Sequence, residues 1–137
     1  MKKLYVVGNK ASKSLSPTIF NYWFRKYNIK ASYGYLELTE RNFHNKIKDI
    51  LEKKDTLGLN VTIPFKNKII KHLGKIDAHA KKIGAVNCVT NKKTINGTNT
   101  DWTGYYKTLP NIKQTKNRKV IILGYGGASH AIHYVLK

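Results

Sequence analysis

The sequence predicts an α/β protein: a three-layer open sandwich with a mostly parallel sheet, followed by the first βα unit of a second, incomplete sheet. Two observations carry this prediction. Short apolar runs alternate with stretches of helical periodicity through roughly the first hundred residues, which is typical of strands joined by helical crossovers. Near the end, a glycine-rich turn over residues 124–127 separates another apolar run from another helical stretch.

The first half of the chain is expected to alternate strands and amphipathic helices. Runs of apolar or alternating residues place the strands at Leu4–Gly8, Tyr33–Leu38 and Leu57–Ile63. Ser16 is expected to cap the first helix, with Pro17 as its first residue, and Thr39 to cap the second. The apolar faces of these helices repeat at helical spacing, and they comprise Phe20, Trp23, Phe24 and Tyr27, then Phe43, Ile47, Ile50 and Leu51.

The next stretch predicts shorter elements and one reversal of direction. A helix is expected over Phe65–Leu73 and a second, short one over Asp77–Ile83. Apolar runs at Ala85–Thr90 and Thr94–Gly97 flank the polar residues 91–93, which indicates a hairpin. One strand of the sheet should therefore be antiparallel.

A helix expected over Thr100–Leu109 leads to the second unit. Residues 107–119 are polar and contain Pro110, so we interpret them as a linker. Val120–Leu123 is then expected to be a buried strand, and Ala128–Lys137 a helix. We therefore divide the chain into residues 1–103 and residues 104–137. A lone βα unit has no sheet neighbours, which makes self-association through it possible.

The formal net charge of +19 raises the question of nucleic acid as a partner. Of the 26 cations 23 are lysines scattered through every segment, and the arginines are Arg25, Arg41 and Arg118. Base readout favours the bidentate fork of arginine, and single-strand binders interleave basic and aromatic residues on one surface. Neither pattern is evident, so we interpret the lysines as a solvated surface and expect no nucleic-acid partner. Their positive field would attract anionic ligands.

Cysteine content and hydropathy restrict the class further. Cys88 is the only cysteine, which excludes an internal disulfide and fits a reducing, cytoplasmic compartment. No apolar run approaches the ~20 residues of a membrane-spanning helix, and the apolar stretch at the start is too short for a signal peptide, so no membrane association is expected. The five histidines lack the spacing of a metal site, so we expect no metal.

Candidate ligand-binding residues follow predicted strand ends. In the run Asn60-Val61-Thr62-Ile63-Pro64-Phe65-Lys66, a strand leads directly into a carboxamide, a hydroxyl and an ammonium group. Ligands of open α/β sheets bind beyond the carboxyl ends of strands, which is where Lys66 is expected. The glycines at 124, 126 and 127 would let a pyrophosphate approach the following helix N-terminus. Taken singly, each feature has an ordinary explanation, as a surface lysine or as a tight turn.

Five short motifs occur in order along the chain. They are Ser14-Leu15-Ser16-Pro17, the run Asn60 to Lys66, Gly84-Ala85-Val86-Asn87, Asn99-Thr100-Asp101 and Gly124-Tyr125-Gly126-Gly127-Ala128-Ser129. Together they resemble the shikimate dehydrogenase family, from the first strand to the last residue. The resemblance implies that residues 1–103 form a substrate-binding domain. It also implies that residues 104–137 hold a connecting helix, a linker and the truncated start of a Rossmann-type dinucleotide-binding domain, about half of a full-length member in all.

The resemblance implies roles for individual residues. Lys66 would take the proton of the hydroxyl that is oxidised, and Asp101 would orient that hydroxyl and hold the ammonium group. The substrate carboxylate would be bound by Ser14 and Ser16, whose ordinary role is to form turns and caps. Ring hydroxyls would be bound, or the pocket braced, by Asn60, Thr62 and Asn87. The cofactor NADP would lie on Gly124, Tyr125, Gly126, Gly127 and Ala128.

The activity that the resemblance implies is the reversible NADP-dependent reduction of 3-dehydroshikimate to shikimate. A quinate/shikimate dehydrogenase that uses NAD and a non-catalytic shikimate-binding domain stay open as alternatives. Since the family's later cofactor and substrate motifs are not in this sequence, little or no turnover is expected of the 137-residue chain alone. Phe20 and Trp102 depart from the family, where His and Gly are common, and so does Tyr125, where a small residue is common.

Overall fold

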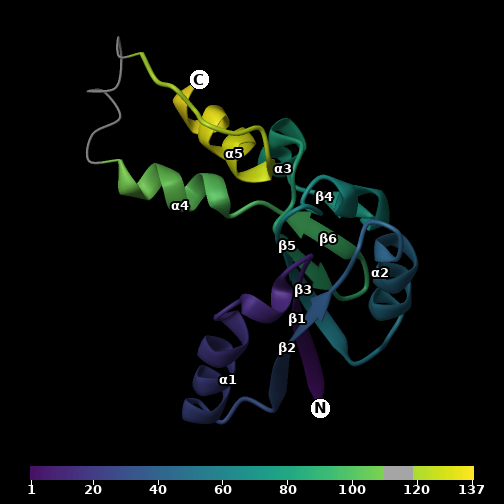
Figure 1. The fold of residues 1–137 in the computed structure, drawn as a ribbon. Helices are drawn as coiled ribbons and strands as arrows, with labels where there is room; N and C mark the ends of the chain where they lie inside the picture. The colour runs from purple at the N-terminus through teal and green to yellow at the C-terminus, as the bar shows by residue number, and fades with distance from the viewer. Residues whose placement is uncertain (110–118) are drawn as a thin grey trace.

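The computed structural model of the chain describes residues 1–109 and 119–137 (Figure 1). A six-stranded sheet forms its centre, in the order β2-β1-β3-β5-β6-β4. The strands are β1 (Lys2–Gly8), β2 (Ala31–Glu37), β3 (Thr56–Val61), β4 (Lys75–Ile76), β5 (Cys88–Asn91) and β6 (Ile95–Thr98). The α-helices are α1 (Ser16–Lys26), α2 (Phe43–Leu51), α3 (Ala78–Ile83), α4 (Asp101–Thr108) and α5 (Gly127–Leu136), and the 3₁₀ turns are η1 (Ala11–Lys13) and η2 (Lys68–His72).

The sheet is mostly parallel, as predicted. β1 pairs in parallel with β2 on one side and with β3 on the other, and β4 pairs in parallel with β6. β5 runs against its neighbours β3 and β6, because it forms a hairpin with β6. The carboxyl ends of β1, β3 and β6 and the beginning of β5 therefore lie along the same side of the sheet, where the parallel strands end.

Helices cover both faces of the sheet, α1 on one and α2 on the other (Figure 1). Successive side chains of a strand point to opposite faces, and β1 shows the result. Val6 packs in a cluster with Tyr33 on the α1 side, whereas Val7 packs in the larger core that includes Phe43 of α2. In that core Phe43 stacks on Phe65, with ring centroids 4.2 Å apart. The predicted three-layer arrangement is confirmed.

The last helices form a smaller unit beside α3. In Figure 1, α4 leads away from the sheet and α5 lies next to α3. Ile83, Ala85 and Ala131 make a small buried cluster, against which Trp102 and Tyr134 pack. Gly84 ends α3 with a φ of 73°, a left-handed conformation that glycine adopts without strain.

The predicted strand of the second unit is not formed. Residues 119–125 belong to no strand, and none of the six strands of the described sheet pairs with them. The side chains expected to be buried there are open to solvent, since Ile121 is 85% and Leu123 is 94% exposed. A strand needs a neighbouring strand for its backbone hydrogen bonds, so this βα unit consists of a turn and helix α5. Residues 110–118 of the predicted linker lie outside the described residues.

Two local predictions are wrong, and a third is correct only in part. Ser16 is the first residue of α1 rather than its cap, and its backbone N–H donates to the Ser14 hydroxyl at 3.2 Å. Thr39 does not cap α2 through its hydroxyl; instead its backbone N–H donates to the Asn42 side chain at 2.9 Å. Of the helix expected over Phe65–Leu73, only Lys68–His72 is helical, as the 3₁₀ turn η2. The two-residue strand β4 that follows is too short for the sequence pattern to show.

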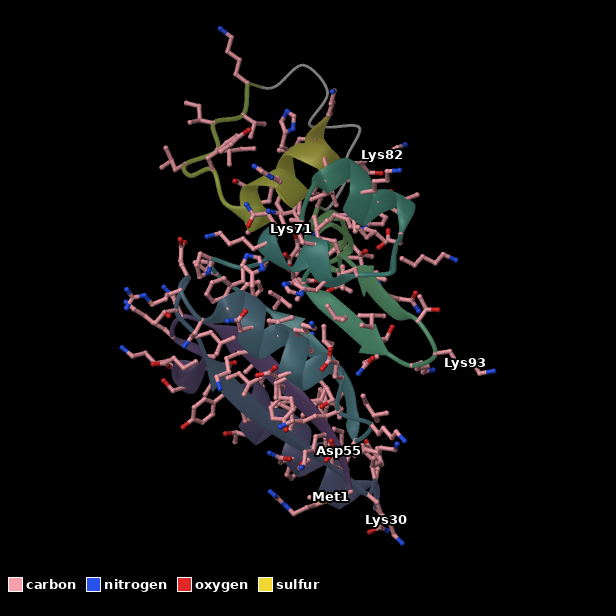
Figure 2. All side chains as sticks on the ribbon, turned by 90° about the vertical axis from the view of Figure 1, so that its right-hand side faces the viewer. Met1, Lys30, Asp55, Lys71, Lys82 and Lys93 are labelled. Carbon is pink, nitrogen blue, oxygen red and sulfur yellow. The ribbon has the colours of Figure 1, made fainter. Side chains whose placement is uncertain are left out.

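The lysines are distributed over several elements rather than gathered on one. Figure 2 labels Lys30 before β2, Lys71 in η2, Lys82 in α3 and Lys93 in the hairpin turn, at separate places on the molecule. Among the described residues, no helix is long and apolar enough to cross a membrane. No group of three His, Cys, Asp or Glu side chains gathers in residues 1–109 and 119–137 as a metal would require. The cytoplasmic location stays a prediction.

Replacing Phe43 with alanine is expected to lower the free energy of unfolding by about 3–5 kcal/mol, because it empties a buried aromatic site. Urea denaturation followed by circular dichroism measures the loss. Ile29→Ala is the matched control, since the Ile29 side chain is 50% exposed. It should change the free energy by less than about 0.5 kcal/mol. Equal losses in the two variants would contradict this description of the core.

Candidate active site

A cleft of about 520 Å³ opens beyond the carboxyl ends of β1 and β3. It is lined by all the residues for which the sequence predicted a role toward the substrate, namely Ser14, Ser16, Asn60, Thr62, Lys66, Asn87 and Asp101. They come from the loop after β1, the start of α1, the end of β3 and the loop that follows it, the segment before β5 and the start of α4. The fold therefore brings together side chains that are far apart in the sequence.

An ion pair lies at one wall of this cleft. Lys66 Nζ is 2.6 Å from Asp101 Oδ2, although the two residues are 35 positions apart. The side chains are 14% and 29% exposed, so the pair is partly shielded from solvent without being removed from it. A charge-assisted hydrogen bond of this kind is shorter and stronger than one between neutral groups. The arrangement puts an amine and an oriented carboxylate side by side against an open space.

The backbone around Lys66 is fixed on both sides. The fully buried side chain of Phe65 anchors the preceding residue in the core, and the Phe65 N–H donates to Thr62 O at 2.9 Å. The Val86 N–H donates to Lys66 O at 2.7 Å, which ties the residue to the segment before β5. The close turn at Thr62 needs Gly8, since a Cβ there would lie 2.4 Å from Thr62 Cγ2.

Asp101 is held by two asparagines. Asn87 Nδ2 donates to Asp101 Oδ1 at 2.8 Å, so each carboxylate oxygen has its own partner. Asn99 is 3% exposed; its side chain donates to Ala85 O and accepts from the Asp101 N–H, both at 2.9 Å. No separate role for Asn99 was predicted from the sequence. Its signal was its position two residues before a helix start, where asparagine forms local turns with the backbone.

Tyr33 lies beneath the cleft and was also missed, because its sequence context marks only a strand. Its hydroxyl donates to Asn60 Oδ1 at 2.6 Å, and its ring stacks on Phe20 with centroids 4.6 Å apart. Burial raises the pKa of Tyr33 to about 12; the nearby Cys88 adds to the rise and Ser16 opposes it. The phenol therefore stays a neutral donor that fixes the Asn60 amide.

The loop between β1 and α1, which contains Ser12 and Ser14, is hydrogen-bonded to the end of β2. Ser12 donates from its backbone N–H to Glu37 Oε2 at 3.1 Å, and its hydroxyl donates to the same oxygen. These hydrogen bonds lower the pKa of the Glu37 carboxyl. Lys10 and Lys13 of this loop also line the cleft, so its walls carry three lysines and one aspartate. A net positive cleft suits an anionic ligand.

The predicted cofactor residues lie at the start of α5. Gly124 has a φ of 117°, Gly126 is the residue before the helix, and Gly127 and Ala128 begin it. A Cβ on Gly124 or Gly126 would meet no atom within 4 Å, which leaves room for a ligand beside the turn. Gly124 and the 89% exposed Tyr125 line a second cavity of about 750 Å³ beside α3 and α5. The free N–H groups of a helix start suit a phosphate.

Tyr33→Phe is expected to alter the dependence of stability on alkaline pH. The folded chain keeps the Tyr33 phenol protonated up to about 12, whereas a tyrosine in the unfolded chain ionises near pH ~10. The stability from this group is full below the unfolded value and is lost as pH rises through the folded one. Urea denaturation at a series of alkaline pH values should therefore show a steeper fall for the parent than for Tyr33→Phe.

The control for this experiment is Tyr35→Phe, in the same strand but 53% exposed. It should reproduce the steep fall of the parent chain. A pH dependence that is unchanged in Tyr33→Phe would contradict the assignment of the raised pKa to Tyr33.

Comparison with known proteins places this geometry in a family. Residues 6–89 match the shikimate dehydrogenase substrate binding domain. The shikimate dehydrogenase (NADP(+)) of Staphylococcus aureus (strain Newman) is 42% identical over 137 residues, covering 98% of this chain and 50% of that protein. The shikimate dehydrogenase of Thermotoga petrophila is 36% identical over 134 residues, with the same coverage of 98% and 50%.

Solved structures agree. The shikimate dehydrogenase from Aquifex aeolicus superposes with a TM-score of 0.88 at 34% identity, covering 99% of this chain and 52% of that one. The enzyme from Thermus thermophilus in complex with NADP(H) and shikimate gives a TM-score of 0.80 at 26% identity, covering 99% and 52%. The chain thus spans about half the length of the curated relatives it matches. Because residues 6–89, more than half of the chain, match the model of this family, the chain belongs to the shikimate dehydrogenase family.

Proposed function

We propose that this chain forms the substrate-binding half of an enzyme that interconverts 3-dehydroshikimate and shikimate with NADP. The observation that carries the proposal is the Lys66–Asp101 pair, 2.6 Å apart, in a cleft that also contains Ser14 and Ser16. We take residues 1–103 as the substrate-binding domain and 104–137 as the connecting helix, linker and start of the cofactor domain. This boundary falls within α4, so the helix joins the two parts.

Lys66 is the proton-transfer residue in this proposal. In the direction of reduction its ammonium group donates a proton to the substrate oxygen as the ketone becomes a hydroxyl; in the direction of oxidation the neutral amine takes that proton back. Asp101 stabilises the ammonium form and orients the hydroxyl. Because Asn87 holds the other carboxylate oxygen, the carboxylate does not need to reorient between the two directions.

The remaining side chains bind and orient the substrate. Ser14 and Ser16 donate to the substrate carboxylate, whose charge is complementary to Lys10 and Lys13 on the same wall. Thr62 is the residue best placed for a ring hydroxyl. Asn60 and Asn87 act mainly as braces, since Tyr33 occupies the carbonyl oxygen of the first, and Thr100 and Asp101 occupy the amide of the second.

The residues at the start of α5 would hold the cofactor's pyrophosphate, namely Gly124, Tyr125, Gly126, Gly127 and Ala128. The open space around Gly124 and Gly126 supports this role. When bound, NADP would provide the hydride for reduction and accept it in oxidation. The Staphylococcus aureus relative is named for NADP(+), which supports NADP over the alternative of an NAD-linked quinate/shikimate dehydrogenase.

Titration with shikimate, by calorimetry or by NMR, tests the proposal on the 137-residue chain. The parent chain should bind shikimate, and Lys66→Ala should weaken binding by about ten- to hundredfold, the usual value of a hydrogen bond to a charged group. Lys71→Ala is the control, because Lys71 lies on the exposed surface in η2. No binding to the parent, or equal losses in the two variants, would sink the proposal.

A steady-state assay with shikimate and NADP separates binding from turnover. The 137-residue chain is expected to turn over far more slowly than the Staphylococcus aureus relative assayed beside it, since it spans 50% of that protein. Turnover equal to that of the relative would contradict the view that much of the cofactor site lies outside these residues.

A further inference from the structure

The first residue of α5 lies against the side chain of Lys66. A Cβ placed on Gly127 would lie 2.9 Å from Lys66 Cβ, 3.0 Å from Lys66 Cδ and 3.4 Å from Ala85 Cβ. Non-bonded carbon atoms are in favourable contact at about 3.5–4.0 Å, so a side chain at this position would overlap the stem of the lysine. The backbone does not require glycine there, because Gly127 is part of the helix.

Lys66 cannot yield to such a side chain by changing rotamer alone. A rotamer change moves Cδ, but it does not move Cβ, which is bonded to the backbone. That backbone is tied to Val86 by a hydrogen bond of 2.7 Å and lies next to the fully buried Phe65. An added methyl group must therefore displace the lysine segment, helix α5, or both.

Helix α5 is also held at this contact. Ala131 lies four residues after Gly127, on the same helix face, and is 0% exposed in the cluster with Ile83 and Ala85. These two small residues let α5 approach the segment that follows α3. A side chain at 127 would therefore press on two anchored surfaces, and displacement of either one would change the position of the lysine stem that lies between them.

We propose that Gly127 is a positioning residue for Lys66: its missing side chain leaves the space in which the lysine stem lies, and so sets where the ammonium group meets Asp101. A glycine of the expected cofactor turn then also serves the substrate cleft. The catalytic meaning of this contact rests on the proposed function, because it takes Lys66 as the proton-transfer residue. The packing between Gly127 and Lys66 does not depend on that function.

Gly127→Ala tests the inference through the ion pair itself. NMR spectra that detect lysine ammonium groups should show a Lys66 signal hydrogen-bonded to Asp101 in the parent chain, assigned by its loss in Lys66→Arg. In Gly127→Ala this signal should shift or vanish, and shikimate affinity should fall about tenfold or more. An unchanged signal and an unchanged affinity in Gly127→Ala would overturn the inference.

Gly104→Ala is the matched control. Gly104 lies exposed in α4, and a Cβ on it would meet no atom within 4 Å. This variant should retain the ammonium signal and the affinity of the parent. If Gly104→Ala abolished the signal as Gly127→Ala does, the effect would come from altered helices rather than from the contact, and the inference would be wrong.

A thermal unfolding cycle covers the case in which Gly127→Ala folds poorly. The substitution is made in the parent chain and in a Lys66→Gly background, where both lysine atoms that the new methyl group would meet are absent. We expect Gly127→Ala to lower the unfolding midpoint in the parent, and to lower it by less than half as much in the Lys66→Gly background. Equal shifts in the two backgrounds would show that Lys66 is not what requires glycine, and would overturn the inference.

The two proposals fail in different ways. A parent chain that does not bind shikimate would sink the proposed function, whereas the ammonium spectrum and the thermal cycle would still decide the role of Gly127.

Discussion

Two backbone hydrogen bonds at the end of β3 and just beyond it hold together the segments that form the site. The Val61 N–H donates to Asn87 O at 2.8 Å, and the Val86 N–H donates to Lys66 O at 2.7 Å. They join the end of β3 to the segment that precedes β5, and this segment in turn leads through the hairpin to Asp101. Because both bonds belong to the main chain, they fix the backbone of Lys66 against the segment that precedes β5.

Hydrogen bonds of polar side chains fix Asp101 and Asn60 in addition to these main-chain bonds. Asp101 has a partner for each oxygen, and the two asparagines that hold it are themselves bonded to the backbone or to Thr100. Tyr33 holds Asn60 in a similar way, because its hydroxyl donates to the Asn60 side-chain oxygen. A network in which each member is satisfied is rigid, and it keeps the groups that face the cleft oriented before a ligand arrives. Preorganisation of this kind lowers the entropy lost on binding.

Much of the fold was predictable from local pattern, and the larger exceptions depend on contacts between residues distant in sequence. Strand alternation and the polar residues between β5 and β6 act over short distances, so the sheet and its one reversal were found. Val120–Leu123 has the composition of a strand, but a strand forms only beside a partner. Tyr33 and Asn99 were missed for the same reason, since their roles depend on contacts with residues distant in sequence. The convergence of Lys66 on Asp101 was suggested by resemblance to a family, because no periodicity relates positions so far apart.

The reversal of β5 has a practical consequence at the other end of the sheet. Since β5 starts beside the cleft and β6 returns to it, the turn between them lies at the opposite end of the strands. There, Asn91 and Lys92 line a pocket together with Lys2 at the beginning of β1. Lys93 of this turn stands clear of the body of the molecule in Figure 2. Cys88 is a free cysteine at the start of β5, beside the cleft. In a chain whose Cys88 is replaced by alanine, a fluorophore or a surface tether attached through a cysteine introduced at this tip would leave the binding face unobstructed, so the molecule could be immobilised in one orientation with its opening toward solution.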